Sequence, residues 1–174
     1  ERFDRDEDGC RIHQEDFNQA LGLIGDRKYE EGDETDRLKR IAGLLKTHAT
    51  SADLQNLLRM TALSVLIRNY DMHAKNIALL HGADDSISLA PMYDVIPSGH
   101  LNVDPEFALA INGKRLVGDV TLADVAEEGR VWGLRNSERI VTETAEQVLA
   151  TAQAERPHPA AHGGLNSAVE SAAA

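Results

Sequence analysis

The sequence lacks several features that would assign it to a class at once. It has a single cysteine, Cys10, so it can form neither an internal disulfide nor a cysteine cluster for a metal, which is typical of a reducing cytoplasm. No apolar run approaches the roughly 18 residues that a membrane-spanning helix needs. No secretory signal is visible, because the first residues are acidic and polar. We therefore expect a cytoplasmic protein that contacts no membrane.

Basic residues and phosphate-binding loops are also scarce. The chain has 18 Lys plus Arg against 29 Asp plus Glu, which gives a formal net charge of −11. Such a field repels phosphate backbones, so we expect no direct binding of nucleic acid. Neither a Gly-x-Gly-x-x-Gly motif nor a Walker-type phosphate loop occurs in the chain.

The composition is otherwise that of an ordinary globular domain. The chain has 174 residues, of which 42% are hydrophobic and 27% charged, as expected for one domain with its own core. Apolar spacing and capping residues predict helices over residues 14–21, 34–48, 52–68, 121–129 and 138–153, with loops over 23–36 and 95–107. Because the first residue is Glu1 and not Met, we expect the chain to be part of a longer protein.

One segment departs from the helical pattern. A polar stretch at residues 69–76 is followed by two short apolar runs, 77–80 and 87–90, around the turn-forming sequence GADD at 82–85. Two such runs predict an antiparallel hairpin, and Pro91 ends the second run because it cannot donate to a strand ladder. The expected fold is therefore mainly α with a small β-hairpin.

Three side chains with oxygen atoms flank this hairpin. Asp71 and Asn76 precede it at a spacing of five residues, and Asp94 follows it. Protein kinases place a catalytic Asp, a metal-binding Asn and a second metal-binding Asp in this order. Because the open end of a hairpin brings its two flanks together, we expect Asn76 and Asp94 to face one Mg²⁺ ion, with Asp71 directed at an acceptor hydroxyl.

Other interpretations of these residues stay open at this point. An Asp followed five residues later by an Asn is common by chance, and both could simply bond backbone groups of a polar loop. A kinase-like lobe could also be a non-catalytic module that binds a partner. A further alternative is a metal-dependent hydrolase in which Asp71, His73 and Asp94 hold a transition metal and activate water.

The residues around this constellation resemble a known family. The string LIRNYDMHAKN at residues 66–76 resembles the catalytic loop of HipA-type serine/threonine kinases, the toxins of bacterial toxin-antitoxin pairs, and LAPMYDVI at 89–96 is similar to their metal-binding segment. ERFDR at 1–5 resembles the hinge strand of the family, and HQEDF at 13–17 and KYE at 28–30 resemble the stretch after it. Tyr70 and Met72 depart from the small or polar residues that the family more often shows.

The resemblance implies a kinase-like C-terminal lobe of the α+β class. It implies a hinge-like strand segment at residues 1–12, the lobe itself at 13–153, and an Ala/Pro-rich, partly helical tail at 154–174. The phosphate-cradling loop of the family belongs to an N-terminal lobe, which the resemblance implies is absent from this chain. We therefore expect this chain by itself to be inactive.

The resemblance also implies a role for individual residues. Asp71 would orient or deprotonate the acceptor hydroxyl, and Asn76 and Asp94 would hold Mg²⁺. His73 and Lys75 would lie against the ATP phosphates, although His73 could instead be satisfied by neighbouring backbone and Lys75 could be a solvated surface charge.

The hinge segment and the partners follow from the same resemblance. The backbone of Glu1 and Phe3 would meet the adenine edge, and Asp4 the ribose. The known substrates of the family are aminoacyl-tRNA synthetases, and its usual partner is a DNA-binding antitoxin.

Overall fold

The chain folds as a mixture of helices and small antiparallel sheets. The structure is a computed structural model that describes residues 2–24, 27–30, 32, 34–99, 106–155, 158, 163, 167 and 169. In chain order its elements are β1 (His13–Asp16), α1 (Phe17–Ala20), α2 (Arg37–His48), α3 (Ser51–Leu66), β2 (Ala78–His81), β3 (Ile87–Leu89), β4 (Glu106–Ile111), β5 (Lys114–Leu116), α4 (Leu122–Val131) and α5 (Ser137–Ala154). The expected α+β class is confirmed, while the three proposed segment boundaries stay predictions.

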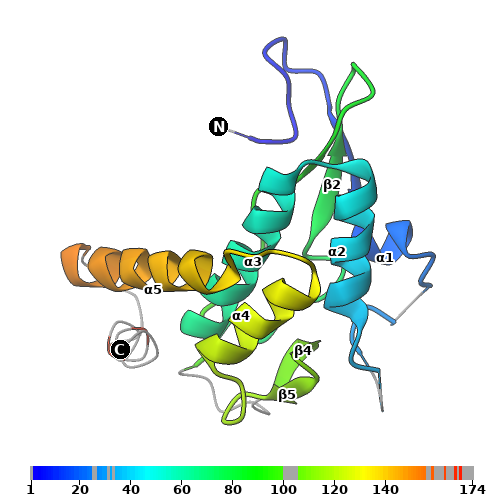
Figure 1. Cartoon of the computed structure of the whole chain (residues 1–174). Helices are drawn as coiled ribbons and strands as arrows, with labels where there is room; N and C mark the ends of the chain where they lie inside the picture. The colour runs from blue at the N-terminus through cyan, green and yellow to red at the C-terminus, as the bar shows by residue number, and fades with distance from the viewer. Residues whose placement is uncertain are drawn as a thin grey trace.

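Helix α3 is the centre of the molecule, as Figure 1 shows. The Thr50 hydroxyl accepts from the backbone N–H of Asp53, whose carboxylate accepts in return from the Thr50 backbone, so a capping box begins the helix. Helices α2, α4 and α5 pack around it. Helix α4 comes so close that a Cβ on Gly129 would lie 2.6 Å from the Cδ2 atom of Leu58, so a larger residue there would force Leu58 to move.

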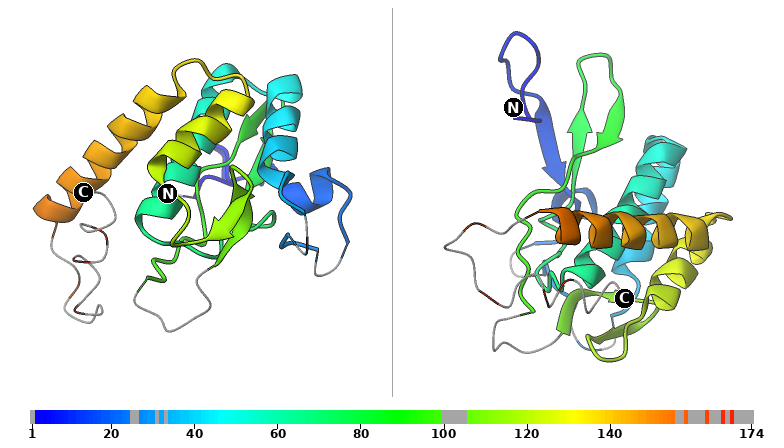
Figure 2. Two further views of the ribbon diagram at one scale, coloured as in Figure 1. Left: turned by 60° about the horizontal axis from the view of Figure 1, so that its bottom comes forward. Right: turned by 90° about the vertical axis from the view of Figure 1, so that its left-hand side faces the viewer.

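The predicted hairpin is confirmed and forms part of a larger sheet. Strand β2 pairs antiparallel with β3 and also with β1, in the order β1-β2-β3. The hairpin stands out from the helices in Figure 1 and in the right-hand view of Figure 2. The fixed register of β2 and β3 places the residues that precede and follow them at one end of the sheet.

The first predicted helix is wrong over much of its length. Residues 13–16 form β1, and only Phe17–Ala20 is helical, with Asp16 as its N-cap. Strand β1 exists because Gln14 and Glu15 pair with Leu80 and Leu79, far away in the sequence. Glu15 and Asp16, which fall inside the predicted helix, therefore belong to a strand and a cap.

A second hairpin replaces part of a predicted loop. Strands β4 and β5 pair antiparallel, so the loop predicted to reach residue 107 ends before residue 106. Asn112 and Gly113 connect the strands with φ angles of 50° and 75°. Asn-Gly with two positive φ angles is the strongest short signal for a tight hairpin turn, and it is visible in the sequence.

The remaining helices agree with prediction to within a few residues. Thr121 caps α4 as expected, through a capping box with Asp124. Among the described residues, no helix is long and apolar enough to cross a membrane.

Candidate active site

The loop of residues 69–76 joins the end of α3 to strand β2. Arg68 adopts a left-handed conformation with φ of 54°, which turns the chain sharply out of the helix. The Asn69 N–H donates to the Ser64 carbonyl at 2.8 Å, and the Arg68 carbonyl accepts from the Ser98 N–H at 3.0 Å. The loop therefore starts from a fixed point on the central helix.

Two other parts of the chain hold this loop from outside. The Ala74 N–H donates to the Lys28 carbonyl at 3.2 Å, and the Tyr70 carbonyl accepts from Ala108 of β4 at 2.9 Å. The Tyr70 ring meets Phe107 edge-on, with 5.8 Å between the ring centroids. Met72 is buried, and its sulfur accepts from the Ser64 hydroxyl. The two residues that depart from the family pattern thus pack the loop onto the core.

Asn76 is oriented by a bond inside the loop. Its Nδ2 atom donates to the backbone carbonyl of Asp71 at 2.9 Å. A carboxamide has one donor end and one acceptor end, so this bond leaves Oδ1 as the end that can bind a cation. The local bonding that we considered as an alternative is therefore present for the amide nitrogen, and it orients the oxygen.

The Asp71 carboxylate lies between a tyrosine and a histidine. Its Oδ1 accepts from the Tyr29 hydroxyl at 2.9 Å and lies 3.8 Å from Nε2 of His73. The Asp71 side chain is 41% exposed, so a substrate can reach it. The Tyr29 ring meets the His73 ring edge-on, with 5.2 Å between the centroids.

His73 is buried and neutral. The residue is 4% exposed, and its Nδ1 atom has no hydrogen-bond partner among the described residues, so neighbouring backbone does not satisfy this nitrogen. Burial lowers the pKa of His73 below 6.5 and outweighs the opposing charges of Asp71 and Asp94. The imidazole is therefore uncharged at neutral pH.

This burial predicts a pH dependence of stability. Because the unfolded chain protonates His73 near pH 6.5 and the folded chain only below it, the free energy of unfolding should fall as the pH drops from 6.5 through the lower folded pKa. We expect His73→Gln to reduce this slope between pH 7.5 and pH 5.5 in urea denaturation. The control is His48→Gln, at an exposed position of α2. Equal slopes in wild type and His73→Gln would contradict the prediction.

The segment with Asp94 is fastened to the same loop. The Tyr93 hydroxyl donates to the Lys75 carbonyl at 2.5 Å, so Asp94 follows a residue that is bonded to the neighbour of Asn76. Burial raises the pKa of Tyr93 to about 12, which keeps the hydroxyl protonated as a donor. Asp94 is exposed, and its backbone has a left-handed conformation with φ of 53°. Its negative charge opposes the lowering of the His73 pKa by burial.

The residues expected to bind the nucleotide differ in their surroundings. Phe3 stacks on Tyr93, with 6.0 Å between the ring centroids, so the first residues lie beside the site. Lys75 is exposed. Asp4 is already bonded to Arg2 at 2.7 Å and to Arg5 at 2.8 Å, and the bond to Arg2 lowers the Asp4 pKa. Glu1 lies outside the described residues.

The described part of the chain gives no support to a histidine-containing metal site. No group of three or more His, Cys, Asp or Glu side chains within it could hold a metal ion. The set of Asp71, His73 and Asp94 proposed for a hydrolase is thus not assembled. The carboxylate of Asp94 and the amide of Asn76 carry oxygen atoms of the type that Mg²⁺ prefers as ligands.

Tyr29 is the site residue that the sequence did not identify. It appeared only as the centre of the KYE string, with no role of its own. Its hydroxyl reaches Asp71 across 42 positions of the sequence, and no local pattern reports such a contact.

Comparisons with known proteins agree with this geometry. The family model described as HipA-like C-terminal domain matches residues 1–155. Two proteins of Sinorhizobium fredii are similar: "Putative kinase Y4dM", 31% identical over 153 residues, and "Putative kinase Y4mE", 36% identical over 140 residues. The matches cover 85% and 74% of this chain but only 35% and 31% of those proteins, so the chain spans about a third of their length.

A solved structure has the same fold. It is HipA of Shewanella oneidensis MR-1, determined in a complex with HipB and operator DNA, and it matches with a TM-score of 0.76 at 22% identity. The match covers 99% of this chain and 46% of that one. That complex includes operator DNA, so the comparison gives no support to the expectation of no direct nucleic acid binding.

Proposed function

Because the chain belongs to the HipA-like C-terminal domain family, we propose that it carries the catalytic loop and the metal ligands of a protein serine/threonine kinase that uses ATP and Mg²⁺. The observation that carries this proposal is the bond from Tyr93 to the Lys75 carbonyl. It joins the segment of Asp94 to the segment of Asn76, beside a loop that exposes Asp71. One carboxylate for the acceptor and two oxygen ligands for a cation are what phosphoryl transfer needs.

Each residue has a defined task in this mechanism. Asn76 Oδ1 and the Asp94 carboxylate would hold Mg²⁺, which neutralises charge on the ATP phosphates. Asp71 orients the acceptor hydroxyl and takes up its proton. The hydroxyl oxygen forms a bond to the γ-phosphorus, while the bond from that phosphorus to the bridging oxygen breaks and its electron pair leaves with ADP.

The relatives suggest partners for the whole protein. We propose a protein acceptor, with aminoacyl-tRNA synthetases as the class to test first, and an antitoxin as the binding partner. The solved HipA complex with HipB and operator DNA supports the second choice. A cytoplasmic location, expected from the single cysteine, stays a prediction.

Nucleotide binding tests the metal site. In the full-length protein, we expect Asp94→Asn to weaken Mg²⁺-dependent ATP binding at least tenfold, about the loss that one charged ligand contributes. Calorimetric titration with and without Mg²⁺ measures this effect. Asp85→Asn is a matched control, because Asp85 is also exposed and left-handed, with φ of 62°, but lies in the hairpin turn. Equal titrations for wild type and Asp94→Asn would contradict the proposal.

A further inference from the structure

We propose that Tyr29 is a positioning residue that aims the Asp71 carboxylate at the acceptor hydroxyl. This inference rests on the proposed function and adds to it a residue from outside the catalytic loop. Tyr29 donates its hydroxyl hydrogen to Oδ1 of Asp71 at 2.9 Å. A hydrogen bond to a carboxylate is directional and stronger than a neutral one, so it can fix the rotation of the side chain.

The geometry assigns different tasks to the two oxygens of Asp71. The Tyr29 hydroxyl and Nε2 of His73 both approach Oδ1, at 2.9 Å and 3.8 Å. Both of these contacts are made at Oδ1 and not at Oδ2. The bond to Oδ1 therefore leaves Oδ2 as the oxygen that receives the proton of the substrate.

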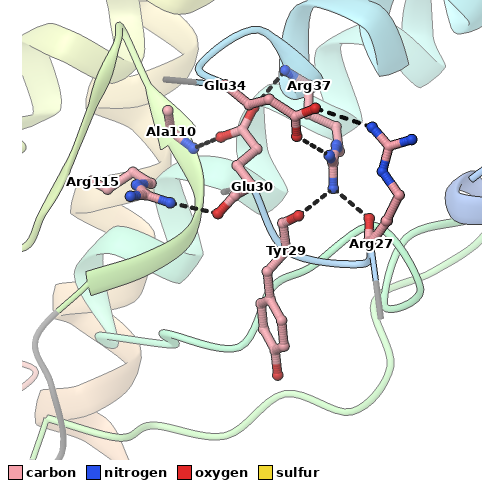
Figure 3. Close-up of polar contacts among 7 residues, drawn as sticks. All are labelled: Arg27, Tyr29, Glu30, Glu34, Arg37, Ala110 and Arg115. Atoms are coloured by element: carbon pink, nitrogen blue, oxygen red, sulfur yellow. Dashed lines mark hydrogen bonds and ion pairs between the residues drawn. The ribbon is translucent and has the colours of Figure 1, made fainter. Parts of the chain in front are cut away.

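Tyr29 can act in this way only if its own backbone is held. The guanidinium of Arg37 donates from Nη1 to the carbonyls of Tyr29 and Arg27, both at 2.7 Å. Arg37 is 1% exposed, although it is the first residue of α2. Figure 3 shows this guanidinium between the two carbonyls, with the Tyr29 ring extending away from the network.

Glu30, the next residue along the chain, is also held by hydrogen bonds. The buried carboxylate of Glu30 accepts from the backbone N–H of Arg37 at 2.7 Å and of Ala110 at 2.5 Å. Arg115 donates to the Glu30 carbonyl at 2.5 Å (Figure 3). Helix α2 and the β4–β5 hairpin therefore anchor the chain immediately after Tyr29.

The ring of Tyr29 is supported by a contact within the candidate site. It contacts the buried His73 ring edge-on, and Tyr29 as a whole remains 38% exposed. The contact fixes the ring plane, while the exposed part leaves the hydroxyl at the margin of the site. Tyr29→Phe preserves the ring contact and removes only the bond to Asp71.

Steady-state kinetics of the full-length protein tests this role. We expect Tyr29→Phe to lower kcat about tenfold, the order expected from one hydrogen bond to a charged group. KM for ATP and the thermal midpoint should stay at wild-type values, because the hydroxyl touches neither the proposed metal ligands nor the core. The control is Thr47→Val, which removes an exposed hydroxyl near the other end of α2 and should leave kcat unchanged.

The outcomes distinguish failure of the positioning role from failure of the proposed function. An unchanged kcat in Tyr29→Phe would overturn the positioning role, and so would a fall in kcat accompanied by a lower thermal midpoint, which would indicate a structural role. A wild-type protein without Asp71-dependent phosphotransfer would overturn the proposed function, and this inference with it.

Discussion

Replacing Asp71 by Asn should abolish phosphotransfer from ATP while leaving nucleotide binding intact. An amide cannot take up the proton of the acceptor hydroxyl, and loss of such a group typically costs about 10²–10⁴-fold in rate. The amide oxygen can still accept from Tyr29, so the loop should keep its conformation. Transfer of labelled γ-phosphate by the full-length protein measures the rate, and calorimetry measures the binding.

The control for this experiment is a carboxylate outside the site. Asp119→Asn changes an exposed residue between β5 and α4 and should retain the wild-type rate. An Asp71→Asn protein as fast as wild type would refute the catalytic assignment. A wild-type protein that binds nucleotide but transfers no phosphate would favour the non-catalytic binding module.

Replacing Arg37 by Met should produce the largest loss of stability. The side chain is buried, and its guanidinium bonds the carbonyls of Arg27 and Tyr29 and the carboxylate of Glu34. Methionine fills similar volume but leaves these acceptors without a donor. Leaving each of the two carbonyls without its donor costs about 1–3 kcal/mol in the free energy of unfolding. Urea denaturation followed by circular dichroism measures this loss.

Arg40 provides the matched comparison. It lies one turn along the same helix and is exposed, so Arg40→Met should change the free energy of unfolding by no more than about 0.5 kcal/mol. Equal losses in the two variants would show that the guanidinium network contributes little.

The sequence predicts those elements whose signals are local. Helix α3 combines a capping threonine with dense apolar residues, and the β2–β3 hairpin has turn residues between two apolar runs. Strand β1 could not be predicted in this way, because it is stabilised by pairing with residues 78–81 and its own acids favour a helix start. The β4–β5 hairpin is different, since its Asn112-Gly113 turn is a local signal that can be read from the sequence.

The candidate site also contains residues with local signals and residues positioned by long-range contacts. The order of Asp71, Asn76 and Asp94 is visible in the sequence, and the bond between Tyr93 and Lys75 supports the expected closeness of the last two segments. Tyr29 and Arg37 act through tertiary contacts between segments that no spacing rule connects. Buried Arg37 even looks like a solvated surface charge when only the helical pattern is considered.

The β2–β3 hairpin has a practical consequence. Its turn, residues 82–85, lies at the end opposite Asn76 and Asp94 and stands clear of the helices (Figures 1 and 2). A peptide tag or fluorophore inserted there would lengthen the hairpin without altering the separation of Asn76 and Asp94. Deleting one residue from β3 would instead change its register against β2 and shift the segment that carries Asp94 relative to Asn76.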